Sequence, residues 1–421
     1  MHPCFISEPT VHRNCFICMN TEFYNWIDQH MADDPARLRL KFAGKQVPGV
    51  DVAAAIVQIE CRRKFGTKLA QTLASFPQFY FPSTLAGEQS TSDLLARYHA
   101  SLVPEGLAAA DLTAGLGIDA LHFAARASSV VAVERNKELT DALRFNADGL
   151  HVENLEIVNG DCRDFVDRCI AEGRRFGAVF IDPARRAADG SRVFALADCE
   201  PDVVAMLPKL KQICRLLVIK ASPMLDITHT IGELSPAPLS VMAVGTPTEC
   251  KELMMLIDFG AEAPYSTMIE AVTLTADGAE TFAFTADAER NAEMPATAPL
   301  AEGNYIYEPS PCLMKTGAFR LVADRYGLRT FQPNTRLFHS PEKIDNFPGT
   351  CWRVVKIFPY ASRVIKRFAR EYPAVNVAVR NFGMSADALR ARLGVRDAGP
   401  LRLYGLTDSR DEKLLVLTEP A

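Results

Sequence analysis

The sequence predicts an α/β fold in which a mostly parallel sheet follows a helical region and precedes a smaller α+β module. Three observations lead to this prediction. Residues 108–134 read in order as strand, glycine turn, helix and strand. Residues 177–182 contain a nearly continuous apolar run, as a parallel strand covered on both faces requires. From residue 304 the composition changes to short apolar runs that alternate with basic helical stretches.

Length and charge narrow the class of protein. A chain of 421 residues is too long for one ordinary core, so we expect several domains. The net charge of -5 does not indicate nucleic-acid binding by the whole molecule, and such binding needs a local basic face. No apolar run is long enough to span a membrane, and no secretory signal begins the chain, so we expect a cytoplasmic protein without a membrane partner. Its eleven cysteines are scattered through apolar stretches, as free thiols in a core are.

The first 18 residues differ in texture from the rest. Cys15 and Cys18 have the spacing of zinc ligands, so a zinc site is one interpretation. The same stretch also contains His2, Cys4 and His12. A single pair with this spacing is a weak signal. We favour the interpretation that translation begins at Met19, that residues 1–18 are a disordered or non-native leader, and that the protein has no metal.

Residues 19–85 predict an N-terminal helical domain. Apolar residues recur at helical spacing in two stretches: Phe23, Trp26 and Ile27, and Val52, Ala55, Ile56, Ile59 and Phe65. A basic cluster accompanies the second stretch: Arg62, Arg63, Lys64 and Lys68. We interpret this cluster as a solvated helix face, with contact to a phosphate backbone as the alternative.

A polar turn leads from these helices into the predicted sheet domain, residues 86–303. Thr91 and Ser92 precede a helical stretch and can cap it. The glycine turn follows. Gly115 and Gly117 have no Cβ, so the backbone can turn sharply and let a ligand approach. Glu134, at the end of the next strand, is placed to bind ribose hydroxyls.

The glycine spacing also fits the dinucleotide fingerprint, whose helix N-terminus receives a pyrophosphate. Asp111 and Asp119 flank the turn, and their negative charges would repel a pyrophosphate bound there. A cofactor that carries positive charge favours both.

The motifs DLTAGLG, VVAVERN and NGD resemble those of the class I S-adenosylmethionine-dependent methyltransferases. The resemblance implies a Rossmann-like, seven-stranded methyltransferase sheet and S-adenosylmethionine as cofactor. It also implies that Asp161 hydrogen-bonds the adenine amine and that Cys162 offers its backbone amide, although Asp161 also fits a helix cap. The implied cofactor-binding residues are Thr91, Asp111, Thr113, Gly115, Gly117, Asp119, Glu134, Arg135, Asp161 and Cys162.

The strand at 177–182 ends in Asp182 and Pro183, where an open α/β sheet binds its ligands. This end resembles the Asp/Asn-Pro-Pro-Tyr enzymes, which methylate exocyclic amines, and the Asp-Pro-Pro-Arg enzymes, which methylate carbon five of uracil. The chain departs from both families, because Ala184 replaces the second proline and Arg185 replaces an aromatic residue.

Carbon methylation needs a thiolate nucleophile, and the following strand brings Lys220 and Ser222 but no cysteine. Amine methylation needs only a group that orients the amine. We therefore assign that role to Asp182 and Pro183. Arg185, with Arg186 beside it, is a candidate substrate clamp or part of a solvated loop.

The sheet is expected to finish with two edge strands, LSVMAVG and CKELMMLID. Asp277 and Gly278 then predict a hairpin, and the Ala/Pro/Glu-rich stretch from residue 286 to 303 predicts a linker. Residues 304–349 form a small connecting α+β segment. Residues 350–421 predict strand, helix, strand, helix, strand, strand, and they resemble the THUMP-like module of a bacterial group of predicted RNA methyltransferases. This module concentrates basic residues: Arg353, Lys356, Arg363, Lys366, Arg367, Arg370, Arg380, Arg390, Arg392 and Arg396.

Together these features predict a cytoplasmic S-adenosylmethionine-dependent methyltransferase that acts on an exocyclic base amine of a structured RNA, either tRNA or rRNA. Two other classes stay open: a methyltransferase for a small molecule or protein, and a non-catalytic RNA-binding protein with a degenerate methyltransferase fold. A dehydrogenase is a third alternative, which a test for nicotinamide binding would exclude if no binding were found.

Overall fold

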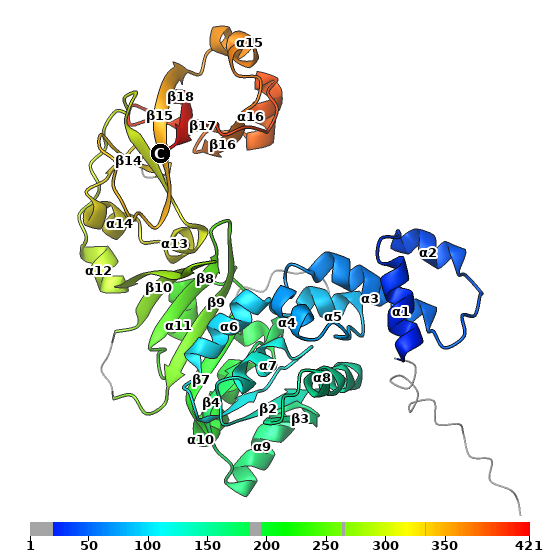
Figure 1. The fold of residues 1–421 in the computed structure, drawn as a ribbon. Coiled ribbons are helices and arrows are strands. Elements are labelled where there is room, and N and C mark those ends of the chain that lie inside the picture. The colour runs from blue at the N-terminus through cyan, green and yellow to red at the C-terminus, as the bar shows by residue number, and fades with distance from the viewer. Residues whose placement is uncertain (1–19, 186–194, 263–265, 333) are drawn as a thin grey trace, which may run out of the picture. The chain divides into compact units, whose positions relative to one another are not determined.

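The computed structural model describes residues 20–185, 195–262, 266–332 and 334–421 (Figure 1). The chain divides into two compact units. One comprises Met1–Val193, Ala197–Ile219 and Asp258–Gly260, and the other comprises Phe194–Leu196, Lys220–Ile257 and Ala261–Ala421. Six residues named in the sequence analysis lie outside the described residues: His2, Cys4, His12, Cys15, Cys18 and Arg186.

A nine-stranded sheet has the order β11-β10-β8-β9-β7-β4-β1-β2-β3. Its strands are β1 (Ala108–Asp111), β2 (Ser129–Glu134), β3 (Leu155–Asn159), β4 (Phe176–Ile181), β7 (Cys214–Ala221), β8 (Ser240–Thr246), β9 (Glu249–Asp258), β10 (Met268–Thr275) and β11 (Gly278–Thr285). Strand β1 pairs in parallel with β2 and β4, β2 with β3, and β4 with β7. The carboxyl ends of β1 to β4 therefore meet at one edge, as the sequence predicts.

The sheet has two strands more than the seven expected. Strands β8 and β9, predicted as the edge, lie inside it because β10 pairs in parallel with β8 and carries β11 as its antiparallel partner. The predicted hairpin is present, with Thr275 opposite Gly278. Residues Ala271 and Val272 of β10 are both buried although they point to opposite faces, so the hairpin completes the core rather than leaving it.

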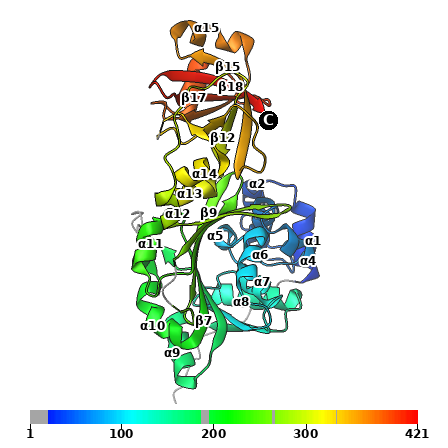
Figure 2. The ribbon, with the colours of Figure 1, turned by 90° about the vertical axis from the view of Figure 1, so that its left-hand side faces the viewer.

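Five helices accompany the first strands: α6 (Asp93–Leu102), α7 (Ile118–Ala124), α8 (Lys137–Gly149), α9 (Cys162–Glu172) and α10 (Val203–Ile213). Figure 2 shows α7 and α8 on one face of the sheet and α9 and α10 on the other. Side chains of Asn136, Asp161 and Asp202 cap α8, α9 and α10. Helix α7 begins without a side-chain cap at Gly117, which has a φ of 85°.

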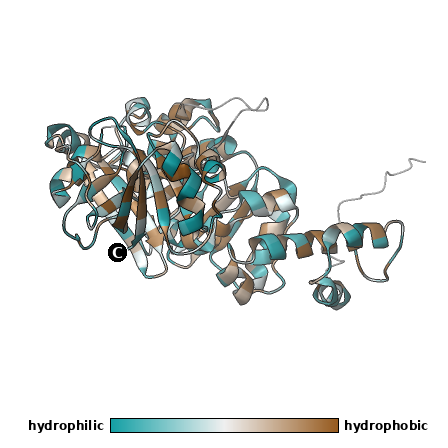
Figure 3. Cartoon of the chain, turned by 90° about the horizontal axis from the view of Figure 1, so that it is seen from above, coloured by the Kyte–Doolittle hydropathy of each residue, from teal (hydrophilic) through white to brown (hydrophobic). Residues whose placement is uncertain are grey.

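The N-terminal helices are α1 (Thr21–His30), α2 (Pro35–Lys41), α3 (Val52–Phe65), α4 (Ala70–Ser75) and α5 (Thr84–Gln89). The predicted apolar faces are confirmed: Phe23, Trp26 and Ile27 of α1 share one buried cluster with residues of α3. Colouring by hydropathy shows hydrophobic residues concentrated along strands and hydrophilic residues along the outer helices and loops (Figure 3).

The interpretation of the basic cluster as a solvated face holds for Arg63 and Lys64, which are exposed, but not for Arg62 and Lys68. The Arg62 guanidinium donates to the backbone oxygens of Pro77 and Phe79, at 2.8 and 3.0 Å. The ammonium of Lys68 donates to the backbone oxygens of Gly87 and Glu88. Because Arg62 and Lys68 bind backbone carbonyls, they hold the segment that leads to the sheet.

The second unit adds α11 (Ile227–Glu233), α12 (Ala286–Asn291), α13 (Pro311–Thr316), α14 (Phe319–Tyr326), α15 (Ser362–Glu371) and α16 (Ala386–Leu393). The prediction of a linker over residues 286–303 is wrong for its first part, because residues 286–291 form α12, which the Thr285 side chain caps.

Three short elements lie between β4 and α10: the strands β5 (Ala184–Arg185) and β6 (Cys199–Glu200) and the 3-10 turn η1 (Leu196–Asp198).

A seven-stranded sheet has the order β13-β14-β12-β15-β18-β17-β16. Its strands are β12 (Tyr305–Pro309), β13 (Arg329–Thr330), β14 (Phe338–Ser340), β15 (Gly349–Pro359), β16 (Asn376–Arg380), β17 (Arg402–Thr407) and β18 (Lys413–Pro420). The predicted order of strands and helices from residue 350 onward is confirmed. Among the described residues, no helix has the length and apolarity to cross a membrane, and no group of three or more His, Cys, Asp and Glu side chains forms a metal site.

Candidate functional site

The glycine turn between β1 and α7 has the backbone conformation that its sequence demands. Gly115 and Gly117 have φ angles of 55° and 85°, in the left-handed region. A Cβ added to Gly115 meets nothing within 4 Å, so this position faces open space. A Cβ on Gly117 lies 2.1 Å from Cδ1 of Leu143. The two glycines therefore differ: Gly115 leaves room for a ligand, and Gly117 lets the turn pack against α8.

The carboxylate of Glu134 holds the turn from the neighbouring strand. Its Oε2 accepts a hydrogen bond from the Gly115 amide at 2.8 Å, and its Oε1 accepts one from the Asn136 amide at 2.7 Å. A carboxylate oxygen can accept two hydrogen bonds, so each oxygen retains one acceptor position beyond these contacts. The Glu134 side chain is half-buried beside the open space at Gly115.

Asp111 and Asp119 both lie beside the turn but contact different groups. Asp111 is buried, and its Oδ1 accepts a hydrogen bond from the Thr113 amide at 3.0 Å. The carboxylate of Asp119 accepts hydrogen bonds from Thr91 Oγ1 at 2.5 Å and from His99 Nδ1 at 2.8 Å. Thr91 thus joins Asp119 rather than capping the helix, and Ser92 accepts the capping bond from the Leu95 amide.

Asp161 begins α9, as its alternative interpretation as a helix cap anticipates. Its Oδ1 accepts from the Arg163 amide at 2.8 Å, and its carboxylate also receives the Arg163 guanidinium, at 2.9 and 2.7 Å. These bonds from Arg163 lower the pKa of Asp161 to about 2. Cys162 is buried beneath it, and burial raises the pKa of its thiol to about 11. The thiol is therefore protonated at neutral pH, and only the backbone of Cys162 is suited to contact a ligand.

Asp182 lies at the end of β4, next to the turn that follows β1. Its backbone amide donates to Thr113 Oγ1 at 2.7 Å, and the Leu112 amide donates to the Phe180 oxygen at 3.0 Å. These two bonds tie the Asp-Pro end of β4 to the start of the glycine turn. Pro183 is buried beside Asp182.

Arg185 lies in β5 and not in an irregular loop, since it is paired with Cys199 of β6. The structure describes its backbone but not its side chain. Arg135 follows Glu134 and is exposed. Lys220, near the end of β7, and Ser222, just after it, both belong to the other unit, and the Ser222 hydroxyl accepts a hydrogen bond from the Met224 amide.

Sequence reasoning missed two buried polar side chains of α6. His99 is fully buried on α6 and stacks on Phe180, with ring centroids 5.6 Å apart. Asp93 accepts hydrogen bonds from the Thr72 hydroxyl and amide, at 2.5 and 3.1 Å. A histidine at helical spacing from the buried Leu95 was the available signal for a polar contact inside this helix.

Comparison with known proteins identifies both parts of the chain. Two family models match its carboxyl-terminal part: a ferredoxin-like domain over residues 305–348 and a THUMP domain-like module over residues 349–420. A crystal structure of a "putative methyltransferase" from Porphyromonas gingivalis is 31% identical and superimposes with a TM-score of 0.83. That match covers 94% of this chain and 97% of the other.

Two curated relatives match a shorter segment. An uncharacterised RNA methyltransferase of Mycoplasma mobile is 30% identical over 101 residues, 24% of this chain and 24% of that protein. An uncharacterised RNA methyltransferase of Clostridium tetani is 26% identical over 94 residues, 22% of this chain and 20% of that protein. The chain thus spans less than a quarter of the length of these curated relatives. The full-length structural match and the THUMP-like module place the chain in one family: it belongs to the methyltransferases that carry a C-terminal THUMP-like domain.

Proposed function

We propose that the protein transfers a methyl group from S-adenosylmethionine to an exocyclic base amine of a structured RNA, either a tRNA or an rRNA. The observation that carries this proposal is the hydrogen-bonded edge that joins Gly115, Glu134 and Asp182 at the ends of three adjacent parallel strands. The names of the two curated RNA methyltransferases and the THUMP-like module support RNA as the substrate.

The residues at this edge fit the cofactor. Gly115 and Gly160 both face open space, since an added Cβ meets nothing within 4 Å at either position. The Glu134 carboxylate lies beside Gly115 and has acceptor positions for the ribose hydroxyls. Asp111 contributes negative charge near the turn, which suits a cofactor with an ammonium and a sulfonium. When bound, S-adenosylmethionine supplies an electrophilic methyl group.

The other proposed contacts follow from their places along the edge. Asp161 and the Cys162 backbone are proposed at the adenine end, and Arg135 stands next to Glu134. The structure gives Thr91 and Asp119 a shared buried hydrogen bond, so we propose that they act by positioning the turn. Thr113 links the turn to the amide of Asp182.

The methyl acceptor is oriented by Asp182 and Pro183 in this proposal. The Asp182 carboxylate and the Pro183 carbonyl accept hydrogen bonds from the amine N–H groups, which directs the nitrogen lone pair toward the methyl group. The nitrogen needs no prior deprotonation, and its extra proton leaves after transfer. Arg185 is proposed to bind a phosphate near the target base.

Two substitutions test the proposal because they separate binding from chemistry. Asp182→Ala is expected to bind S-adenosylmethionine as the unchanged protein does but to lose methyl transfer by roughly 100-fold or more. Glu134→Ala is expected to weaken cofactor binding by about 1–3 kcal/mol, since it removes charge-assisted hydrogen bonds. Calorimetry measures binding, and transfer of a labelled methyl group to unmodified RNA, followed by nucleoside mass spectrometry, measures the reaction.

Exposed carboxylates of the same unit supply the controls. Asp164→Ala and Glu153→Ala remove side chains that face solvent, and both variants are expected to bind and react normally. Full methyl transfer by Asp182→Ala removes it from the reaction, and unchanged affinity of Glu134→Ala removes it from the cofactor site. Labelling that survives nuclease digestion of the acceptor pool points instead to a small-molecule or protein substrate, and binding of NAD without S-adenosylmethionine points to a dehydrogenase.

A further inference from the structure

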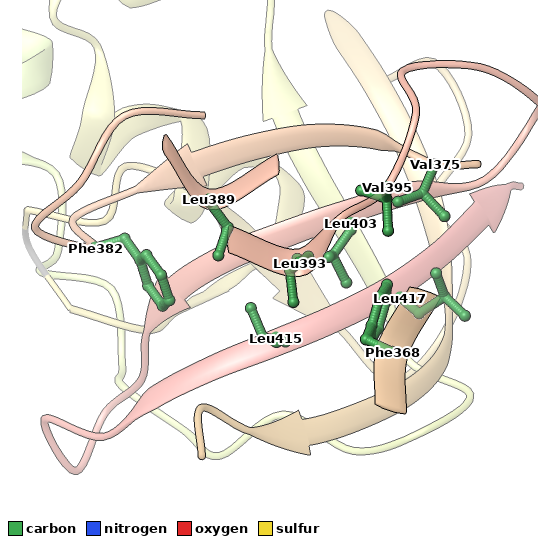
Figure 4. Packing of buried hydrophobic residues seen from close by; sticks show 9 residues of the cluster. All are labelled: Phe368, Val375, Phe382, Leu389, Leu393, Val395, Leu403, Leu415 and Leu417. Carbon is green, nitrogen blue, oxygen red and sulfur yellow. The ribbon is translucent and has the colours of Figure 1, made fainter. Parts of the chain in front are cut away.

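Helix α15 (Ser362–Glu371) has two faces of opposite character. Its apolar side chains Val364, Ile365 and Ala369 pack against a hydrophobic cluster, and Phe368 is buried within it. Figure 4 shows Phe368 pointing into this cluster, near Leu417. Successive residues of an α-helix are about 100° apart, so the remaining basic residues fall on the opposite side.

These basic residues are Arg363, Lys366, Arg367 and Arg370, called here the α15 basic face. By helical geometry they occupy an arc of about 100°, and the first and last are about 10 Å apart along the axis. All four side chains are exposed. Four positive charges thus lie close together on one surface of a chain whose net charge is -5.

The α15 basic face differs from other basic residues nearby in its lack of partners. Arg353 pairs with Glu419 at 2.8 Å, and Arg390 pairs with Asp387 at 2.6 Å. Within the described residues, by contrast, none of the four α15 cations makes an ion pair, a side-chain hydrogen bond or a ring contact. The sequence identifies ten basic residues in this module, and only the structure separates the paired from the unpaired.

We propose that the α15 basic face binds the sugar-phosphate backbone of the substrate RNA, an inference that rests on the function proposed above. Arginine presents a planar fork that binds phosphate oxygens in pairs, and the face contains three arginines. A row of cations about 10 Å long matches a polyanion, whose charges repeat every few Å, better than it matches a single small anion.

An anionic membrane surface is the other polyanion to consider. Helices that bind at a membrane surface insert an apolar face between the lipids. The apolar face of α15 is already occupied, because Phe368 is only 3% exposed and packs in the protein core. The observations therefore favour RNA.

Phosphate contacts predict a particular response to salt. Each contact contributes about 0.7 to 0.9 to the slope of log affinity against log salt concentration. Two double variants, Arg363→Gln with Arg367→Gln and Lys366→Gln with Arg370→Gln, are each expected to reduce that slope by about 1.5. At moderate salt we expect each to weaken RNA binding about tenfold, with cofactor affinity unchanged.

The experiment uses the full-length protein and a fluorescein-labelled, unmodified tRNA transcript, with anisotropy as the readout. The matched control is Arg353→Gln with Arg390→Gln, which removes the same charge from two paired arginines of the same unit and is expected to change affinity less than twofold. Circular dichroism verifies that every variant is folded. In methyl-transfer assays the α15 variants are expected to need more RNA for half-maximal rate while retaining the maximal rate.

The possible failures are distinguishable. If the unchanged protein binds and methylates the transcript, and the α15 variants match the control variant, the inference is wrong and the proposed function stands. If the unchanged protein neither binds nor methylates RNA, the proposed function and the inference fall together. If vesicles containing phosphatidylserine bind through these four residues and the transcript does not, the surface belongs to a membrane instead of RNA.

Discussion

At the scale of single residues, burial decides which polar groups are available for chemistry. Asp119 and Glu134 flank the same turn, yet Asp119 contacts two protein donors in a buried network while Glu134 is half-buried at the open side of Gly115. The sequence predicts both as cofactor contacts, Asp119 from its charge beside the glycine turn and Glu134 from its place at the end of the next strand. It could not predict the contact from Asp119 to His99, since the two residues are 20 positions apart and meet only after the chain folds.

The buried His339 of β14 is expected to make the second unit less stable in acid. Its ring is buried, its Nε2 donates to the Ala298 oxygen at 3.1 Å, and its Nδ1 has no hydrogen-bond partner among the described residues. Burial lowers the pKa of His339 to about 4. The unfolded chain, in which a histidine has a pKa of about 6.5, takes up the proton first as the pH falls. The free energy of unfolding is therefore expected to fall by up to about 3 kcal/mol between pH 7 and pH 4 through this residue.

A His339→Gln variant keeps an N–H donor for Ala298 and abolishes this titration. Its free energy of unfolding is expected to vary less with pH than that of the unchanged protein. Urea unfolding followed by Trp352 fluorescence, in a Trp26→Phe background, measures the second unit alone. His229→Gln, at an exposed histidine of the same unit, serves as the control. Identical pH dependence in both variants contradicts the expected role of His339.

At the scale of elements, the turn between β1 and α7 shows what sequence patterns predict well and what they miss. Glycines after an apolar run predict the turn, and the structure confirms it. The pattern assigns both glycines to ligand approach, whereas Gly117 is needed because α8 packs against it through Leu143. A sequence shows which positions lack a Cβ but not which neighbour occupies the space.

Alanine substitutions separate these two reasons. Gly115→Ala is expected to cost about 1–2 kcal/mol of stability, from the left-handed backbone alone. Gly117→Ala is expected to cost about 3 kcal/mol, because the clash with Leu143 adds to the backbone term. Hydrogen exchange of amides in β1 and β2 measures both costs.

A double variant, Gly117→Ala with Leu143→Ala, removes the clash. It is expected to be more stable than the sum of the two single changes by about 1 kcal/mol or more. If the stability losses of the two single variants add up to that of the double variant, Leu143 is not the group that excludes a side chain at position 117.

At the scale of the whole chain, the sequence predicts a boundary between segments 304–349 and 350–421 that the hydrogen bonding crosses. Strand β12 pairs with β15 along its length. The Glu308 carboxylate of β12 accepts hydrogen bonds from Arg402 at 2.6 Å and from Tyr404 at 2.9 Å, and it also pairs with Arg380. Burial and the Glu308 charge raise the pKa of Tyr404 above its usual range. Periodicity predicts each of these strands, but contacts between residues more than 70 positions apart leave no local signal.

Glu308→Ala is therefore expected to destabilise both segments together. The change leaves two cations and a buried hydroxyl without their acceptor, and such a loss costs roughly 2 kcal/mol or more. Hydrogen exchange is expected to accelerate in β12 and in β17 to a similar extent. Glu419→Ala breaks the exposed pair with Arg353 and is expected to cost less than about 1 kcal/mol. Faster exchange confined to β12 shows that the two segments unfold independently.

Strand β18 (Lys413–Pro420) lies between β15 and β17, inside the seven-stranded sheet. On the ribosome, β12 and β15 emerge well before the strand that completes their sheet. Until residue 420 has left the exit tunnel, β15 has an unpaired edge, and such edges are prone to aggregation. This sheet therefore completes only after β18 has been synthesised, and a chain that halts before β18 keeps an unpaired strand edge for chaperones and proteases to recognise.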